Sequence, residues 1–140
     1  MKRLIFVFYA LTVIVSGQNL SQVKEPASRV REQYRQAYNR HDAEAVLALY
    51  GDDAVLLSEA GVFRGKAEIR KWLQFAFDQG SRLETITPAR ENSSATIAYG
   101  TGRTKRLAGK EVHLGRYLIV LEKRKGRWLI IEHASFNVHE

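Results

Sequence analysis

Hydrophobic residues recur at helical spacing through the first half of this chain. Steps of three and four positions predict helices over residues 26–40, 43–50 and 66–77. Pro26 suits the first turn of the first helix, and Asp42 is a favourable N-cap residue for the second. The pattern therefore predicts three amphipathic helices ahead of the main block of strands.

Strand-like patterns account for most of the other positions. Short apolar runs predict a small hairpin before the third helix, at 54–57 and 62–63, and alternating runs predict strands at 82–88, 95–106, 112–123 and 127–138. Ala108-Gly109 and Lys125-Gly126 are typical of tight turns between antiparallel strands. This order predicts an α+β fold in which three N-terminal helices pack on one face of a strongly curved, mostly antiparallel sheet.

The first seventeen residues have the pattern of a signal peptide. Lys2 and Arg3 precede an apolar run at 4–15, and Val15-Ser16-Gly17 offers small residues for cleavage. The alternative is an uncleaved anchor, but the apolar run is shorter than the ~20 residues that a spanning helix needs. The sequence predicts a signal peptide at 1–17, a single domain at 18–140, a periplasmic or secreted location and no stable membrane span.

The chain is basic, with a formal net charge of +7, and it contains no cysteine. The charge either attracts anionic ligands, headgroups or polymers, or it serves solubility alone. The run Lys123-Arg124-Lys125, with Arg127, makes one predicted turn a candidate site for an anionic polymer. We expect no nucleic-acid partner, because such a site needs aromatic residues interleaved on an open sheet face and an exported protein rarely meets nucleic acid.

The histidines do not have the spacing of a metal site. The chain has four, His41, His113, His133 and His139, with no pair four residues apart and no HxH or HExxH motif. A glycine-rich phosphate loop and a GxSxG turn are also missing from the sequence. We therefore expect no metal and no other cofactor.

Several segments carry a family resemblance. They are 34–42 (YRQAYNRHD), 49–56 (LYGDDAVL), 65–69 (GKAEI) and 126–129 (GRWL), together with His133 and Ser135. In these segments the chain resembles the nuclear transport factor 2-like superfamily, and more narrowly its SnoaL-like and ketosteroid isomerase-like branch. The resemblance implies a cone-shaped, cystatin-like roll with a pocket between helices and sheet. It leaves the function open, because this superfamily contains isomerases, dehydratases, cyclases, binding proteins and association modules.

The resemblance to ketosteroid isomerases carries over at one of three catalytic positions. Those enzymes have an oxyanion-stabilising tyrosine eight residues before the aspartate that opens the second helix, and Tyr34 and Asp42 reproduce that spacing. The position of the aspartate base corresponds to Ser58, with Glu59 beside it, and the second oxyanion donor corresponds to Gly115. Steroid isomerisation is therefore not expected, because the loss of a positioned base removes a ~10²–10⁴-fold contribution to the rate.

The last predicted strand alternates in polarity. Strict alternation places Leu129, Ile131, His133, Ser135 and Asn137 on one face, and Trp128, Ile130, Glu132, Ala134 and Phe136 on the other. By resemblance, the face with His133 lines the interior of the cone. This histidine could act as an acid, a base or a hydrogen-bond donor near neutral pH, or it could be a core residue satisfied by a backbone or tyrosine partner.

The candidate site residues follow from these patterns. The candidate catalytic residues are His133, Tyr34 and Glu59. The candidate ligand contacts are Ser58, Trp72, Tyr99, Arg116, Tyr117, Ile131, Ser135 and Asn137. For each of them, core packing or solvent exposure is the alternative interpretation.

Besides a basic surface that binds anionic polymers through the turn at 123–127 and the arginines of the first predicted helix, two functions fit the sequence. The first is an exported domain that binds a small apolar or weakly acidic molecule, with cofactor-free isomerisation, dehydration or hydrolysis as its reaction if it is an enzyme. The second is a non-catalytic association module with a vestigial pocket. It would form a homodimer through the convex face of the sheet, on which the alternation places Trp128, Ile130 and Phe136.

Overall fold

The computed structural model describes residues 25–138 as three helices and six strands. In chain order they are α1 (Pro26–Asn39), α2 (Ala43–Leu47), β1 (Tyr50–Ser58), β2 (Gly61–Arg64), α3 (Gly65–Asp78), β3 (Ser81–Ser93), β4 (Ile97–Ala108), β5 (Glu111–Arg124) and β6 (Arg127–Asn137). The predicted signal peptide lies outside the described residues. Within the described part, no helix is long and apolar enough to cross a membrane.

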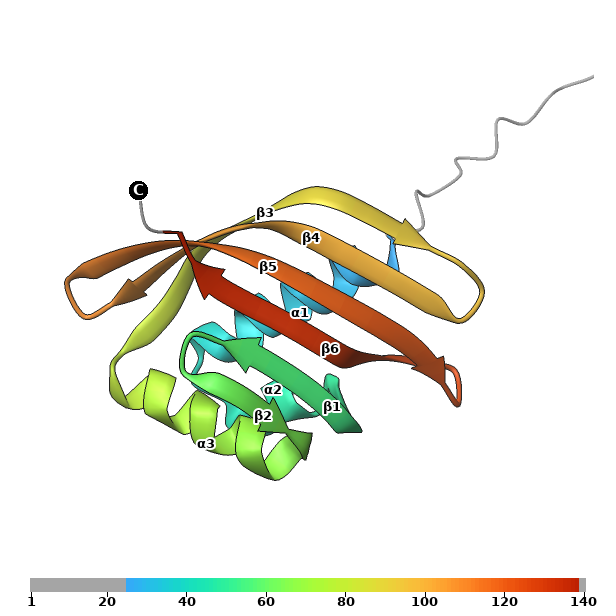
Figure 1. Cartoon of the computed structure of the whole chain (residues 1–140), viewed down its shortest axis with the longest axis horizontal. Coiled ribbons are helices and arrows are strands. Elements are labelled where there is room, and N and C mark those ends of the chain that lie inside the picture. The colour runs from blue at the N-terminus through green and yellow to red at the C-terminus, as the bar shows by residue number, and fades with distance from the viewer. Residues whose placement is uncertain (1–24, 139–140) are drawn as a thin grey trace, which may run out of the picture.

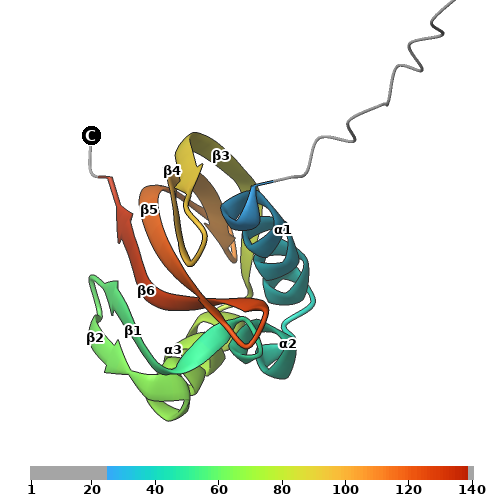
Figure 2. The same cartoon turned by 90° about the vertical axis from the view of Figure 1, so that its right-hand side faces the viewer.

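The six strands form one sheet in the order β2-β1-β6-β5-β4-β3. All neighbouring strands are antiparallel except β1 and β6, which are parallel. The sheet curls around α1, which lies along its concave side, and α3 lies beneath the β1–β2 end (Figures 1 and 2). The predicted α+β cone, with helices on one face of a curved and mostly antiparallel sheet, is confirmed.

Helix α1 supplies one wall of the core. Its buried side chains recur every three or four residues, as an amphipathic helix requires, and include Val30, Tyr34 and Tyr38. The hydroxyl of Tyr38 donates a 2.8 Å hydrogen bond to Oγ of the buried Ser81. This bond ties α1 to the start of β3 and fixes one end of the space between helix and sheet.

The second helix is shorter than the sequence predicts. It ends at Leu47 rather than at residue 50, and Tyr50 opens β1 instead. The amide of Ile130 donates a 2.8 Å hydrogen bond to the carbonyl of Leu49, and Tyr50 pairs with Ile130 across the sheet. Pairing with β6 thus outcompetes the local helical preference, and it points the Tyr50 side chain into the core, where it is fully buried.

The predicted strict alternation of the last strand is wrong, because β6 contains a bulge. Leu121 pairs with Ile130 and Val120 pairs with Glu132, so Ile131 is an extra residue without an opposite partner. The bulge brings Ile130 to the same side as His133, and Ile130 is buried in the core. It therefore does not belong to the convex face, as the alternation predicts.

Small residues on β4 let α1 approach the sheet. A Cβ atom at Gly100 would lie 3.1 Å from the Cβ of Ala27 in α1, and one at Gly102 would lie 2.2 Å from the carbonyl oxygen of Thr87. Side chains larger than hydrogen do not fit at Gly102, where β3 bends next to Pro88. The inward side of this part of β4 is thus filled by helix and neighbouring strand.

Candidate functional site

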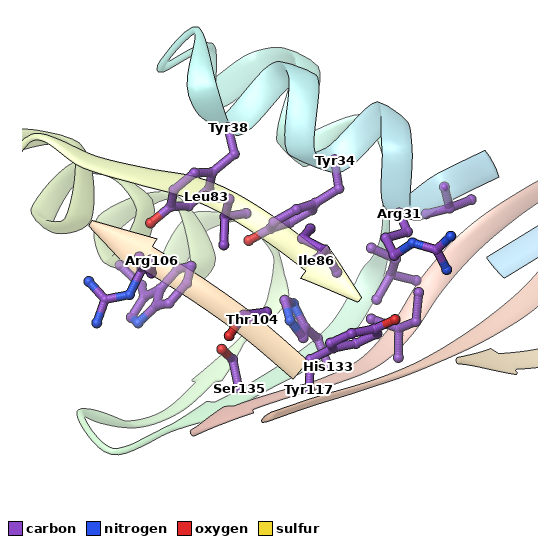
Figure 3. Close-up of a pocket in the computed structure, with 14 residues that line it drawn as sticks. Arg31, Tyr34, Tyr38, Leu83, Ile86, Thr104, Arg106, Tyr117, His133 and Ser135 are labelled. Atoms are coloured by element: carbon purple, nitrogen blue, oxygen red, sulfur yellow. The ribbon is translucent and has the colours of Figure 1, made fainter. Parts of the chain in front are cut away.

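A cavity lies between α1, α3 and the concave face of the sheet (Figure 3). Its volume is about 60 Å³, and most of its walls are aliphatic or aromatic. The lining residues come from α1, α3 and strands β3 to β6 and are Val30, Arg31, Tyr34, Tyr38, Trp72, Leu83, Ile86, Thr104, Arg106, Tyr117, Ile119, Ile130, His133 and Ser135. The same arrangement that closes the cone therefore gathers a few polar groups in an apolar space.

The central polar group of the cavity is the imidazole of His133. Its Nδ1 lies 2.5 Å from the hydroxyl oxygen of Tyr50, and both side chains are buried, at 5% and 0% exposure. The ring of Tyr34 meets the imidazole edge to face at a centroid separation of 5.5 Å. Aromatic packing on one side and a hydrogen bond on the other hold the imidazole in one orientation.

Burial sets the charge of this pair. It lowers the pKa of His133 to about 4, because the charged imidazolium loses its hydration, and it raises the pKa of Tyr50 far above its usual value. At neutral pH both groups are uncharged. Two neutral arrangements satisfy this contact: the Tyr50 hydroxyl donates to Nδ1 and the ring proton is on Nε2, or Nδ1–H donates to the Tyr50 oxygen. The first presents an N–H donor to a ligand, and the second presents a basic lone pair.

Tyr117 adds a second donor to the cavity wall. Its side chain is only 8% exposed, and its hydroxyl has no hydrogen-bond partner among the described residues. A buried hydroxyl without a partner costs about 1–3 kcal/mol. A ligand oxygen or a water molecule in the cavity would remove that cost.

Two arginines line the cavity in different electrostatic states. Arg31 forms an ion pair with Glu91, and both side chains are largely buried. Arg106 has no carboxylate within ion-pair distance in residues 25–138, and it donates only long hydrogen bonds, each of 3.4 Å, to Ser81 Oγ and Asn137 Oδ1. Arg106 is thus a cation in the cavity wall whose charge is not neutralised by a neighbouring acid.

A second, outer hollow of about 190 Å³ adjoins this cavity and shares Tyr38, Trp72, Arg106 and Ser135 with it. Its other lining residues include Ser58, Glu59, Phe75 and Asn137. The carboxylate of Glu59 accepts a hydrogen bond from the backbone amide of Asn137, at an exposed position. The outer hollow therefore forms a wider, more polar entrance to the apolar cavity.

The structure brings together eight of the eleven candidate residues. Tyr34, Trp72, Tyr117, His133 and Ser135 line the cavity, and Ser58, Glu59 and Asn137 line the outer hollow with Trp72 and Ser135.

The other three candidates lie elsewhere. Arg116 is exposed, on the side of β5 opposite to Tyr117, and Tyr99 lies on the side of β4 opposite to the buried Ala98 and Gly100. Ile131 occupies the bulge, and Ile130 lines the cavity in its place.

Sequence reasoning missed Tyr50, Arg106 and Thr104. Tyr50 was missed because residues 43–50 were predicted to be helical, whereas Tyr50 is the first residue of β1. Arg106 and Thr104 share the inward side of β4 with Gly102. Counting every second residue after Gly102 would have predicted both as inward-facing.

Asp42 and Gly115, the two other positions compared with ketosteroid isomerases, have structural roles. Asp42 caps α2 by accepting a 3.0 Å hydrogen bond from the amide of Ala45. Gly115 is buried, and a Cβ atom there would lie 2.8 Å from Thr104 Oγ1 and from the Phe136 carbonyl oxygen, so this position cannot supply a side-chain donor. Residues 25–138 contain no group of three or more side chains that could hold a metal ion.

Comparison with known proteins identifies the class. The model of the SnoaL-like domain family matches residues 30–131, which is most of the chain. The fold, the cavity and this match place the chain in the nuclear transport factor 2-like superfamily, in its SnoaL-like and ketosteroid isomerase-like branch. The chain belongs to the SnoaL-like domain family. No curated protein sequence matches it significantly.

Solved structures share the fold at low sequence identity. A protein of unknown function with a cystatin-like fold from Nostoc punctiforme superposes with a TM-score of 0.72 at 17% identity, over 81% of this chain and 89% of that chain. A ketosteroid isomerase-like protein from Erwinia carotovora atroseptica gives a TM-score of 0.69 at 23% identity, over 82% and 95%. A protein from Xanthomonas campestris, described as a calcium/calmodulin dependent protein kinase II association domain, gives 0.69 at 23% identity, over 81% and 86%.

Proposed function

We propose that this protein binds a small, mostly apolar molecule that carries a hydrogen-bond acceptor such as a carbonyl or carboxylate oxygen. The observation that carries the proposal is the buried His133 in an apolar cavity, with its Nδ1 engaged by the Tyr50 hydroxyl. We assign the ring proton to Nε2, which makes the imidazole a donor to the ligand. A single fixed donor in apolar surroundings is the usual means by which small-molecule pockets orient a ligand.

Two further groups support an oxygen-bearing ligand. The Tyr117 hydroxyl lacks a protein partner among the residues described, and Arg106 lacks a neighbouring carboxylate. A carbonyl oxygen would satisfy the hydroxyl, and a weakly acidic group would suit the guanidinium. The polar groups thus favour a ligand whose oxygen atoms enter the cavity first.

The volume of the cavity limits the part of the ligand that enters it. An engineered cavity of about 150 Å³ holds a benzene molecule, whereas this cavity measures about 60 Å³. It accepts a short head such as an acetyl or carboxymethyl group, and a ring would remain in the outer hollow beside Trp72 and Phe75. A polycyclic substrate of steroid size does not fit inside.

The geometry supports binding better than proton abstraction. In the proposed tautomer His133 presents a donor, and Glu59 lies at the exposed entrance, hydrogen-bonded to a backbone amide. An enzyme of the isomerase type needs a base that faces the substrate carbon inside the pocket. We therefore propose a binding role, and we propose a location outside the cytoplasm on the basis of the sequence pattern of residues 1–17.

The test compares two ligands of one shape. Ethylbenzene and acetophenone share a ring and a two-carbon arm, but only acetophenone has a carbonyl oxygen. We expect titration calorimetry to give at least fivefold tighter binding of acetophenone, and the preference should disappear in His133→Phe. The matched control Thr104→Val changes another polar lining residue and should keep the preference. Equal binding of both compounds by the unmodified protein, or binding of neither, would contradict the proposal.

A homodimer is the second candidate, and the convex face of the sheet favours it. Exposed apolar side chains lie next to each other on β5 and β6: Leu114 opposite Val138, Leu118 opposite Ala134, and Phe136. Contiguous apolar surface of this kind is typical of interaction sites. The structural similarity to a protein described as an association domain supports a second copy of this chain as the partner.

A further inference from the structure

A third hollow lies at the opposite end of β6 from the ligand cavity. It is lined by the first half of α1, the link from α2 to β1 and the β5–β6 hairpin. Its volume is about 330 Å³, and Val30 is the one residue that also lines the cavity of the proposed function. The side chains that matter for its chemistry are Arg29, Gln33, Arg127 and Trp128.

The hollow is positively charged. Arg29 and Arg127 both line it, and no acidic side chain does. Neither arginine has a carboxylate within ion-pair distance in the described part of the chain, although Arg31, Arg35, Arg70 and Arg124 each have at least one. Two arginines that approach from separate elements without a counter-ion create a local field that attracts an anion.

The guanidinium of Arg127 has one contact with the backbone. It donates a 3.3 Å hydrogen bond to the carbonyl oxygen of Ala48, which leaves its other N–H groups available for a ligand. A guanidinium can bind two oxygens of a phosphate, sulfate or carboxylate at once. Arg127 thus directs an exposed cation toward this hollow with its donors largely free.

Trp128 provides a flat aromatic wall in the same hollow. Its side chain is half-buried, and Lys123 Nζ lies 5.9 Å from the centre of the ring. An indole of this kind stacks with other rings, and the lysine adds a third positive charge nearby. The combination of a ring and several cations selects for ligands that have both a ring and a negative charge.

We propose that this hollow is a second binding site, which takes an anionic aromatic molecule. The ring of the ligand stacks on Trp128, and its phosphate, sulfate or carboxylate group lies between Arg29 and Arg127. Gln33 can donate to or accept from a polar substituent at the edge of the ring. The site is independent of the proposed function, because its polar residues do not contact the ligand cavity.

The chain is suited to a direct test, since it contains two tryptophans, Trp72 in the ligand cavity and Trp128 in this hollow. In Trp72→Phe, tryptophan fluorescence reports on Trp128 alone. The probes are 4-nitrophenyl phosphate, the uncharged 4-nitroanisole and inorganic phosphate. We expect saturable quenching by 4-nitrophenyl phosphate, at least tenfold weaker binding of 4-nitroanisole, and displacement of the aryl phosphate by inorganic phosphate only at much higher concentration.

Substitutions locate the binding. Arg127→Gln should weaken 4-nitrophenyl phosphate binding at least fivefold, whereas Arg103→Gln should leave it unchanged, because Arg103 is an exposed arginine on β4 away from the hollow. Binding should also weaken as the salt concentration rises from 20 to 200 mM, on the order of severalfold. Circular dichroism of each variant confirms that it is folded.

Three outcomes would overturn the proposal. The first is equal quenching by 4-nitroanisole, which would show that charge has no role. The second is an equal loss in Arg103→Gln, which would indicate attraction by net charge alone. The third is the same saturable quenching in Trp128→Phe, where Trp72 is the reporter, because the aryl phosphate would then occupy the ligand cavity. Each of these outcomes concerns binding of the aryl phosphate, whereas the proposed function is tested by the preference for acetophenone over ethylbenzene, so the two proposals fail separately.

Discussion

At the residue scale, the chemistry of the site depends on one buried pair. An imidazole that lacks the Tyr50 hydroxyl could carry its proton on either nitrogen. In the proposed tautomer the hydroxyl donates to Nδ1, which removes that freedom and leaves His133 Nε2–H as a donor of fixed direction. Burial then keeps the pair neutral, so the cavity offers a directed dipole and no charge at its centre.

The first prediction concerns the pH dependence of stability. The pKa of His133 falls from the usual 6.5 to about 4 on folding. Between these pH values the imidazole is therefore protonated in the unfolded chain and neutral in the folded chain. Stability is therefore complete above about pH 6.5 and declines as the pH falls toward 4, by on the order of 3 kcal/mol. Urea unfolding between pH 7.5 and 4 measures this.

The control for this decline is His133→Gln, which removes the titrating group and keeps a polar side chain. Exposed carboxylates such as Asp53, whose pKa is lowered by its bond to Arg124, contribute equally in both proteins. The difference between the two stability profiles therefore isolates the imidazole. Parallel profiles from pH 6.5 to 4 would contradict a neutral, buried His133.

The second prediction concerns Tyr50→Phe. The substitution keeps the ring and removes the hydroxyl, so Nδ1 of His133 loses its partner inside the core. We expect the free energy of unfolding to fall by about 1–3 kcal/mol, and the preference for acetophenone over ethylbenzene to fall, because the proton is no longer confined to Nε2. Chemical denaturation and calorimetry measure the two effects.

Tyr38→Phe is the matched control for that substitution. It also removes a buried tyrosine hydroxyl, but this hydroxyl bonds to Ser81 rather than to the imidazole. We expect a similar loss of stability with the acetophenone preference retained. Loss of the preference in both variants would mean that general loosening of the cavity, and not the tautomer of His133, controls binding.

At the element scale, the fold followed from the sequence wherever local pattern decides it. The bounds of α1 and α3 lie within a residue or two of the predicted helices, because their apolar stripes face a single partner surface. Turn glycines with positive φ, such as Gly109 and Gly126, mark the hairpins of the meander. Local chemistry was sufficient for these elements.

The parts that could not be predicted depend on contacts between distant segments. Tyr50 becomes a strand residue because β1 pairs with β6, eighty residues away in the chain. The bulge at Ile131 lets β6 pair with β5 on one side and with β1 on the other. No residue within β6 itself predicts the bulge. The phase of the last strand ahead of His133, and with it the place of Ile130 rather than Ile131 in the cavity wall, is therefore a tertiary property.

The third prediction belongs to β4. Gly102→Ala should destabilise the fold by about 1–3 kcal/mol or more, because the added methyl group would overlap the Thr87 carbonyl oxygen and the Tyr117 ring, at 2.2 and 2.6 Å. Gly100→Ala is the matched control, since its nearest atom, the Cβ of Ala27, lies at 3.1 Å, so a movement of α1 by a few tenths of an ångström would make room for the methyl group. In thermal unfolding, Gly102→Ala should have a much lower Tm than Gly100→Ala. The reverse order would contradict the close packing at Gly102.

At the scale of the whole molecule, the convex face has a pattern that suits a two-fold axis. The row Leu118–Ala134 lies between the row Arg116–Phe136 and the row Val120–Glu132. Rotation by 180° about the central row would set that row against its own copy and the row Arg116–Phe136 against the row Val120–Glu132, so that Arg116 of one copy lies diagonally opposite Glu132 of the other. Such self-complementarity is what a symmetric dimer requires of a single surface.

The fourth prediction follows from that arrangement. We expect the protein to sediment as a dimer at micromolar concentration, and Leu118→Arg to sediment as a monomer, because it places two charges against each other at the axis. Phe75→Arg is the control, since Phe75 is also exposed but lies on α3, away from the convex face.

Because the chain has no cysteine, Leu118→Cys offers an independent measurement. Its single thiol should cross-link two copies rapidly under mild oxidation, and a protein that stays monomeric and uncross-linked would exclude this face as a homodimer interface.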